Sequence, residues 1–269
     1  MPEHADAAIN EETGHFSPEV RRRWIVDRVL RNKTVDVDEL CEHLKVSRMT
    51  IHRDLDDLHN QGALRKVRGG ATVQPSYLFE SDIGFRLRSN VKEKEALARH
   101  ALTLVEPGQA IMLDDSTTVR ALAVLLPAIK PLTIITNCLG IMAQLCGERE
   151  IHQISLGGEY MPSFDSYTGL VCENAIASLR ANQLFMSASA VSGGVAFHQN
   201  QEITKTKEAM MRSSARKILM VDHSKFGKVA LHRLTPLDAF DLVLVDSGLE
   251  ESWLNELGDA HIAYKVVPV

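Results

Sequence analysis

The chain has 269 residues, more than one compact domain usually contains, and its formal net charge is −5. Its 45% hydrophobic and 24% charged residues are ordinary for a globular protein and exclude a wholly disordered chain. The cysteines form neither a C-x-x-C pair nor a zinc-binding spacing, so we expect reduced thiols, no metal and no cofactor: Cys41, Cys138, Cys146 and Cys172.

The first residues are polar and acidic, unlike an export signal, and no apolar run approaches the roughly 18 residues of a membrane helix. We therefore expect a cytoplasmic protein without a membrane partner. Residues 1–16 hold four acidic and no basic residues, which predicts a disordered acidic tail. Residues 17–73 hold twelve basic and nine acidic residues, and such a local positive excess is typical of a surface that binds phosphates.

Three helices are predicted in residues 17–73. Ser17 followed by Pro18 is a helix start, because serine caps free amides and proline suits the first helical position. Asp36 begins a second helix, and Glu39 completes a capping-box pattern with it. Ser47 begins a third helix, whose apolar residues share one face and whose polar residues point away from it.

A short hairpin is predicted after the third helix, in the stretch ALRKVRGGATV. The whole pattern fits a winged helix-turn-helix that binds double-stranded DNA. It also fits a three-helix bundle whose charged residues are only solvated. The outward residues of the third helix and the hairpin are the candidate DNA contacts: Ser47, Arg48, Met49, Thr50, His52, Arg53, Arg65, Lys66 and Arg68.

The stretch VSRMTIHRDLDDLHNQGALRKVRGGA resembles the DNA-binding head of the DeoR family of bacterial regulators. His52 replaces the first arginine of the family's pair, and Arg68 stands where the wing histidine is usual; both still offer hydrogen-bond donors. Helix geometry predicts that Ser47, Thr50 and the wing cations hold phosphates, while Arg48, Met49, His52 and Arg53 lie near base edges. A homodimer or homotetramer is also implied, because one module buries too little surface to select an operator.

Residues 74–90 lack a clear period and are predicted to connect two domains. Beyond them, strand and helix patterns alternate over 91–269, which predicts an α/β domain with a mainly parallel sheet covered on both faces. The expected strands are 110–114, 132–136, 151–156, 183–188, 217–221, 241–245 and 263–267. The expected helices lie near 91–105, 117–126, 138–146, 169–180, 201–214 and 249–257.

Three strand-to-helix turns in this domain carry polar side chains, and ligands of open α/β sheets bind at such turns. The first turn holds Asp114, Asp115 and the hydroxyls of 116–118, which suit an anion at a helix start. The second holds Asn137, and the third the pair Gly157 and Gly158. Each turn is also explained by ordinary capping or turn chemistry.

The stretches LDDSTT, TNCLG, SLGG and VDHSKFG resemble the sensor domain of the same family, which is similar to ribose-5-phosphate isomerase and whose effectors are typically phosphorylated sugars. The resemblance implies an effector site in which Asp114 binds sugar hydroxyls and Thr117 and Thr118 bind phosphate. It places these residues at the site: Lys94, Asp114, Asp115, Ser116, Thr117, Thr118, Asn137, Gly157, Gly158, Glu202, Lys207 and Lys225. Asp115 and Ser116 depart from the family's small residue and glycine, which adds a carboxylate. The histidines lack metal spacing and receive no role.

Two classes of function fit these features. A transcription regulator released by a phosphorylated sugar or sugar derivative explains both halves of the chain, with repression as the default. An isomerase or transferase would use Asp114, Asp115 or Glu202 as general base, but it leaves the N-terminal module unexplained. A DNA-binding architectural protein with a scaffold-only second domain is a third alternative.

Overall fold

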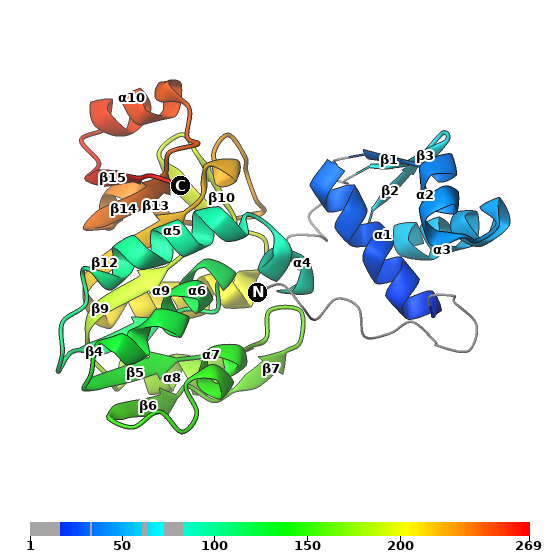
Figure 1. Ribbon diagram of the computed structural model, residues 1–269. Helices are drawn as coiled ribbons and strands as arrows, with labels where there is room; N and C mark the ends of the chain where they lie inside the picture. The colour runs from blue at the N-terminus through cyan, green and yellow to red at the C-terminus, as the bar shows by residue number, and fades with distance from the viewer. Residues whose placement is uncertain (1–16, 33, 61–63, 73–82) are drawn as a thin grey trace. The chain divides into compact units, whose positions relative to one another are not determined.

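The computed structural model describes residues 17–32, 34–60, 64–72 and 83–269. The chain divides into two compact units, Met1–Phe79 and Glu80–Val269, each described here by itself (Figure 1). The predicted tail 1–16 and residues 74–82 of the predicted connection lie outside the described residues. Among the described residues, no helix has the length and apolarity that crossing a bilayer requires.

The described residues of the first unit form three helices and a small antiparallel sheet of order β1-β3-β2. Its elements are α1 (Pro18–Asn32), β1 (Thr34–Asp36), α2 (Val37–Leu44), α3 (Arg48–Asn60), β2 (Arg65–Val67) and β3 (Gly70–Thr72). The predicted hairpin is present, and β1, which was not predicted, adds a third strand to it. Gly70 is required there, because a Cβ at this position would lie 2.0 Å from the carbonyl oxygen of Val35.

The predicted caps of this unit are present, with one correction. The Asp36 carboxylate accepts from the Asp38 amide at 2.7 Å, and the Ser47 hydroxyl accepts from the Thr50 amide at 3.2 Å. The capping box at α2 was wrong: Glu39 instead binds Arg28 of α1, with an Nη2–Oε1 distance of 2.7 Å. A buried cluster that includes Ile25, Leu40 and Leu55 holds the three helices together.

The second unit is built on seven parallel strands in the order β15-β14-β12-β9-β4-β5-β6. They are β4 (Ala110–Leu113), β5 (Leu132–Thr136), β6 (Ile151–Ser155), β9 (Ala181–Met186), β12 (Ser214–Val221), β14 (Leu242–Asp246) and β15 (Tyr264–Val267). All seven predicted strands are present. The chain order reverses between β4 and β9, so this boundary is the topological switch point at which ligands of such sheets bind.

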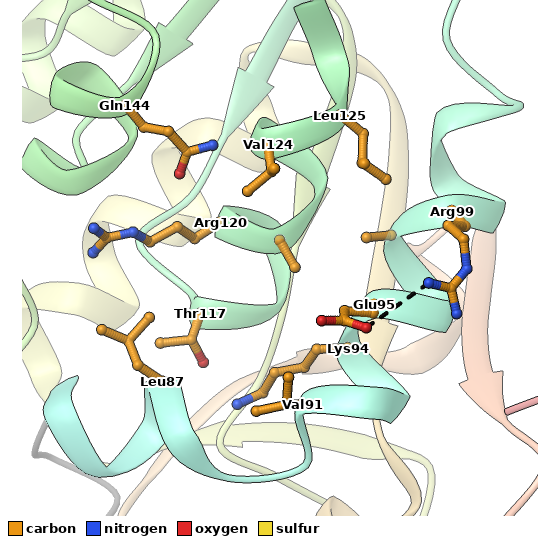
Figure 2. A pocket seen from close by; sticks show the side chains of 12 residues that line it. Leu87, Val91, Lys94, Glu95, Arg99, Thr117, Arg120, Val124, Leu125 and Gln144 are labelled. Carbon is orange, nitrogen blue, oxygen red and sulfur yellow. Dashed lines mark ion pairs between the residues drawn. The ribbon is translucent and has the colours of Figure 1, made fainter. Parts of the chain in front are cut away.

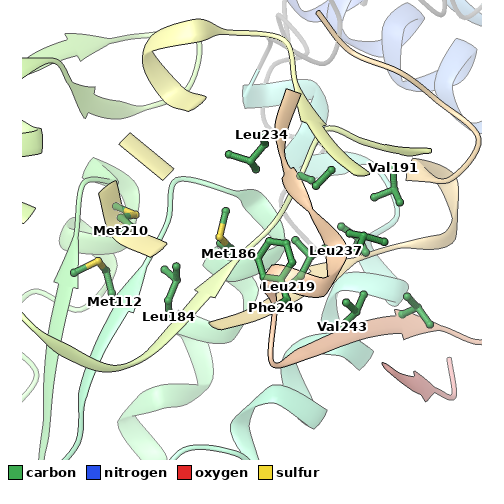
Figure 3. Packing of buried hydrophobic residues seen from close by; sticks show 14 of the residues in the cluster. Met112, Leu184, Met186, Val191, Met210, Leu219, Leu234, Leu237, Phe240 and Val243 are labelled. Atoms are coloured by element: carbon green, nitrogen blue, oxygen red, sulfur yellow. The ribbon is translucent and has the colours of Figure 1, made fainter. Parts of the chain in front are cut away.

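Helices cover both faces of this sheet (Figure 1). They are α5 (Val91–Leu102), α6 (Thr117–Leu125), α7 (Leu139–Gln144), α8 (Leu170–Ala177), α9 (Gln201–Arg212) and α10 (Glu251–Asp259), with 3-10 turns at Leu126–Ala128, His223–Lys225 and Leu237–Ala239. Alternate residues of each strand enter opposite cores: Ile111 and Leu113 pack beneath α5 to α7, while Met112 packs beneath α8 to α10. Figure 3 shows the second of these cores, to which Met112, Met210 and Leu219 all belong.

Several short elements of this unit escaped the sequence prediction. They are α4 (Ile83–Arg88), the pair β7 (Glu159–Met161) and β8 (Ser166–Thr168), and the sheet β10 (Ala190–Ser192), β11 (Val195–His198) and β13 (His232–Pro236). The C-terminal part of the predicted connection 74–90 is not a connection. Residues 83–90 belong to the second unit, and α4 packs on α6.

Candidate functional site

The outward face of α3 carries the residues expected to meet DNA. Met49 is 82% exposed, and His52 and Arg53 are exposed beside it. Ser47 and Thr50 share a hydrogen bond of 2.9 Å between their hydroxyls at the start of the helix. An exposed methionine flanked by donors is suited to base edges rather than to a core.

Two of the candidate cations are paired in the free protein. Arg48 binds Asp38 at 2.7 Å, and Lys66 binds Asp56 at 2.6 Å. The Arg48 pair is exposed and the Lys66 pair is partly exposed, so exchanging the carboxylate for a phosphate costs little. Within the described residues Arg53, Arg65 and Arg68 have no carboxylate partner and present their charge directly.

Asp54, on the inner face of α3, is a structural residue that sequence reasoning missed. It is 3% exposed, and its carboxylate binds Arg21 of α1 at 2.5 Å and Arg22 at 3.3 Å. This buried pairing fixes α3 against α1, and thereby sets the angle at which Arg53 is presented. The signal in the sequence was an aspartate at the i+3 position from buried Ile51, on the apolar face.

In the second unit, a cavity lies at the switch point, at the carboxyl ends of β4, β9 and β12; we call it the switch-point cavity. Six residues predicted for the effector site line it: Lys94, Ser116, Thr117, Thr118, Lys207 and Lys225. The Ser116 hydroxyl caps α6 by accepting from the Val119 amide at 3.2 Å. The start of α6 therefore faces the cavity with its positive dipole end and two threonine hydroxyls.

Asp114 and Asp115 lie behind this lining in a buried ion-pair cluster. Lys207 of α9 binds Asp114 directly and Asp115 Oδ1 at 3.2 Å, and all three side chains are at most 3% exposed. Burial alone would raise the pKa of Asp115, but Lys207 and Arg86 beside it hold that pKa below its usual value. Asp114 also accepts from the amides of Ser116 and Ser187, at 2.9 Å and 2.8 Å, so its oxygens are engaged within the fold.

Lys94 of α5 bridges the cavity and α4. Its ammonium donates to the carbonyl oxygens of Arg86 and, at 2.6 Å, of Ser89. Burial lowers the pKa of Lys94 to about 8, with Asp222 opposing that effect and Lys225 and Arg86 adding to it. The Lys94 ammonium is therefore protonated at neutral pH, and a change in its burial or in the neighbouring charges changes its pKa.

Arg86 and His198 are cavity residues that the sequence prediction did not assign. The Arg86 guanidinium carbon lies 5.0 Å from the ring centre of Phe164, and the His198 ring contacts the same ring in a tilted arrangement, with 5.6 Å between ring centres. Burial lowers the pKa of His198 to about 3, helped by the nearby charge of Lys207, so its imidazole is neutral. Arg86 lay in the predicted connection, and one histidine among eleven gave no pattern.

Four predicted effector residues lie elsewhere. The Asn137 amide donates to the carbonyl oxygen of Tyr167 at 2.9 Å, and Glu202 pairs with Lys205 on the surface of α9 at 2.9 Å. Gly157 and Gly158 lie after β6 and outside the cavity lining. Gly158 has a φ of +133°, and a Cβ there would lie 2.4 Å from the carbonyl oxygen of Thr168, so its role is in packing.

A second pocket, the apolar groove, lies between α4, α5 and α6 and has a volume of about 370 Å³. Figure 2 shows Leu87, Val91 and Val124 along it, with Lys94 and Thr117 at the end that it shares with the switch-point cavity. Across the described residues, no group of three or more potential metal ligands occurs.

Two family models match the chain. A DeoR-like helix-turn-helix domain matches residues 21–76, and a DeoR C-terminal sensor domain matches residues 89–247. The chain belongs to the DeoR family. It is a DNA-binding transcription regulator with a winged helix-turn-helix unit and an α/β sensor unit.

Curated relatives of this DeoR-family regulator cover most of its length. The regulator YgbI of Escherichia coli (strain K12) is 33% identical over 236 residues, 87% of this chain and 92% of the relative. The regulator GolR of Listeria innocua is 30% identical, covering 93% and 98%. A lactose phosphotransferase system repressor of Staphylococcus epidermidis is 31% identical, covering 83% and 90%.

Solved structures similar to this DeoR-family chain are more distant. A D-ribose-5-phosphate isomerase in complex with phospho-erythronic acid is 14% identical, with a TM-score of 0.39 over 51% of this chain and 54% of that chain. A translation initiation factor eIF-2B of Pyrococcus horikoshii OT3 is 14% identical, with a TM-score of 0.42 over 84% and 86%.

Proposed function

We propose that this regulator represses transcription of genes for carbohydrate use until a phosphorylated sugar or sugar derivative binds in the switch-point cavity. The observation that carries the proposal is the lining of that cavity: the ammonium groups of Lys94 and Lys225 and the hydroxyls of Thr117 and Thr118 surround one space at a helix start. Cations and a helix start suit a phosphate. The relatives named lactose phosphotransferase system repressors support a link to sugar metabolism.

The departure at Asp115 and Ser116 leaves this anion site intact. Asp115 is turned into the ion pair with Lys207, which it shares with Asp114, rather than toward the cavity, and Arg86 adds a second positive charge beside it. Ser116 supplies the cap of α6 that a glycine cannot supply through a side chain. In this proposal the two carboxylates shape the site through Lys207, and the sugar hydroxyls meet Lys207, Ser187 and Ser189 instead of Asp114.

For DNA, the proposal places the outward face of α3 in the major groove of an operator half-site. Arg48, Met49, His52 and Arg53 then lie near base edges, while Ser47, Thr50 and the wing cations hold phosphates. A pair of chains binds two half-sites. Effector releases the pair only if it binds the DNA-free conformation more tightly than the DNA-bound one, since equal affinity shifts nothing.

The experiment is an operator-binding titration against a panel of pentose and hexose phosphates and the same sugars without phosphate. We expect release by a phosphorylated compound only. Thr118→Val or Lys225→Ala removes one hydrogen bond to the anion, worth roughly 1.5–3 kcal/mol, so release should need about tenfold to a hundredfold more compound. Release of both variants at the wild-type concentration would place the effector elsewhere.

An isomerase or transferase is the function that the cavity supports less well. General-base catalysis needs a carboxylate within hydrogen-bond reach of the substrate. Asp114 and Asp115 are engaged by Lys207, and Glu202 is paired with Lys205 outside the cavity lining. We expect no turnover of the releasing compound by the purified protein, measured by NMR of the incubated mixture.

A further inference from the structure

Helix α4 contributes no residue to the hydrophobic cores and is held to the sensor unit by polar contacts and by the Arg86 guanidinium over the Phe164 ring. None of its six residues is buried, and Leu87, its residue in the apolar groove, is 41% exposed. Its last turn is instead fixed through the carbonyl oxygen of Arg86, which accepts from Lys94 and, at 3.3 Å, from the Thr117 hydroxyl. Lys94 donates in addition to Ser89, the residue that follows the helix.

A further contact anchors the junction between α4 and α5. Asn90 has a positive φ of 49°, and its side-chain amide donates at 2.8 Å to both Asp222 and Ser224 after β12. The groups that hold α4 thus come from the start of α6, from α5 and from the turn after β12. Lys94, Thr117, Asn90 and Asp222 also line the switch-point cavity.

The size of the cavity indicates that α4 closes it. Its volume is about 40 Å³, room for roughly three water molecules at about 10–15 Å³ each. Pockets that enclose a small organic ligand usually measure about 300–1,000 Å³. Phe85 and Arg86 of α4 form one wall. A sugar phosphate fits only if a wall moves. The α4 wall moves at least cost, because each of its six residues is partly exposed and none belongs to a hydrophobic core, although Arg86 contacts the Phe164 ring.

We propose that α4 is a latch on the switch-point cavity, and that the anion of the effector opens it by taking Lys94 and Thr117 away from the α4 backbone. The inference rests on the proposed function, because it needs an anionic effector in this cavity. A phosphate oxygen offers the Lys94 ammonium an opposite charge as well as a hydrogen bond, whereas the carbonyl oxygens of α4 and Ser89 are neutral. The same two side chains therefore serve either α4 or the ligand.

The latch connects the effector to DNA through the chain itself. Helix α4 is the first described element of the sensor unit, and residues 73–82 join it directly to the helix-turn-helix unit. The closed latch corresponds to the operator-binding form, and the opened latch to the released form. A variant with a weakened latch should therefore resemble the effector-bound protein before any effector is added.

The test compares two threonines that make the same kind of bond. Thr117→Val removes the hydroxyl that holds α4, whereas Thr103→Val removes a hydroxyl that donates to the His100 carbonyl at the exposed end of α5, 2.7 Å away. Without effector, we expect Thr117→Val to bind operator about two- to tenfold more weakly and Thr103→Val to match wild type. Amide hydrogen exchange of residues 83–90 should be faster in Thr117→Val alone, measured on the full chain.

Asn90→Gly provides a second variant, since glycine keeps the positive φ and removes only the contacts to Asp222 and Ser224. It should also weaken operator binding without effector. The latch proposal is overturned if Thr117→Val binds operator as tightly as Thr103→Val does and amide exchange in residues 83–90 is unchanged. That result leaves the effector proposal untouched. If no sugar phosphate releases wild type, the proposed function fails, while the effector-free comparison still decides whether α4 controls DNA binding.

Discussion

Lys207 shows how a single buried residue can decide what its neighbours do. Two adjacent carboxylates at the end of β4 read, in the sequence, as groups that could bind sugar hydroxyls or act as a base. One lysine from α9, ninety-three positions along the chain from Asp114, engages both and keeps its own pKa raised despite burial. The motif was visible in the sequence, but its partner was not, because only the fold brings α9 to β4.

Lys94 leads to a prediction about pH. Burial lowers its pKa to about 8, and the facing charges are Asp222, Lys225, Arg86 and Glu93. A bound phosphate favours the ammonium and raises the pKa of Lys94 in the complex. Binding thus requires the protonated form, so effector affinity should be constant below about pH 8 and fall up to tenfold per pH unit above it.

Calorimetric titration of the full chain with the releasing sugar phosphate at pH 7.2, 8.2 and 9.2 measures this effect. The phosphate itself, with a second pKa of about 6, is dianionic throughout that range and adds no pH dependence. In Lys94→Gln, affinity should be lower and the decline above pH 8 absent. A decline of the same steepness in Lys94→Gln would assign the pH effect to another group.

At the scale of elements, the regular ones were predictable and the short ones were not. All seven strands of the parallel sheet followed from apolar runs, because both faces of such a sheet are buried. The three-residue strands β1, β7, β8 and β10 are too short to show a period, and β1 depends on pairing with β3, which is distant in the chain. Helix α4 has only six residues, none of them buried, and is therefore too short to show a helical period in the sequence.

Two adjacent residues of α3, Arg53 and Asp54, have different predicted roles: Arg53 contacts DNA, and Asp54 holds the helix in place. Arg53→Ala should weaken operator binding about tenfold to a hundredfold and leave stability within about 0.5 kcal/mol, because the side chain is exposed. Asp54→Ala leaves Arg21 buried without its carboxylate and should destabilise the helix-turn-helix unit by about 3–5 kcal/mol.

Urea titration followed by the fluorescence of Trp24 in α1 measures the stability of this unit, in a Trp253→Phe background that removes the other tryptophan. Both variants are compared with that parent. A loss of stability in Arg53→Ala equal to that in Asp54→Ala would mean that Arg53 is a structural residue. An unchanged midpoint in Asp54→Ala would show that its pairing with Arg21 does not fix α3.

For the whole molecule, each chain carries one recognition helix and one sensor, and selecting an operator requires more contact than one module offers. A single module buries about 600–1,000 Å² on DNA, the low end for specific binding. Two chains related by a two-fold axis would read half-sites on one face of the duplex, about 10 base pairs apart or a multiple of that. The spacing of the half-sites is then as important as their sequence.

This symmetry predicts how the full chain responds to insertions at the centre of its operator. Five added base pairs rotate one half-site by about half a turn, so only one recognition helix can dock and affinity should fall toward that of an isolated half-site. Ten or eleven added base pairs restore the rotational phase and should recover part of the lost affinity. Fluorescence anisotropy measures the affinity of the full chain for the unmodified operator, for the two operators with insertions and for one isolated half-site. The protein concentration is kept above the dissociation constant of its self-association. Equal affinity for all three operators would show that the two recognition helices bind independently and would contradict the symmetric dimer.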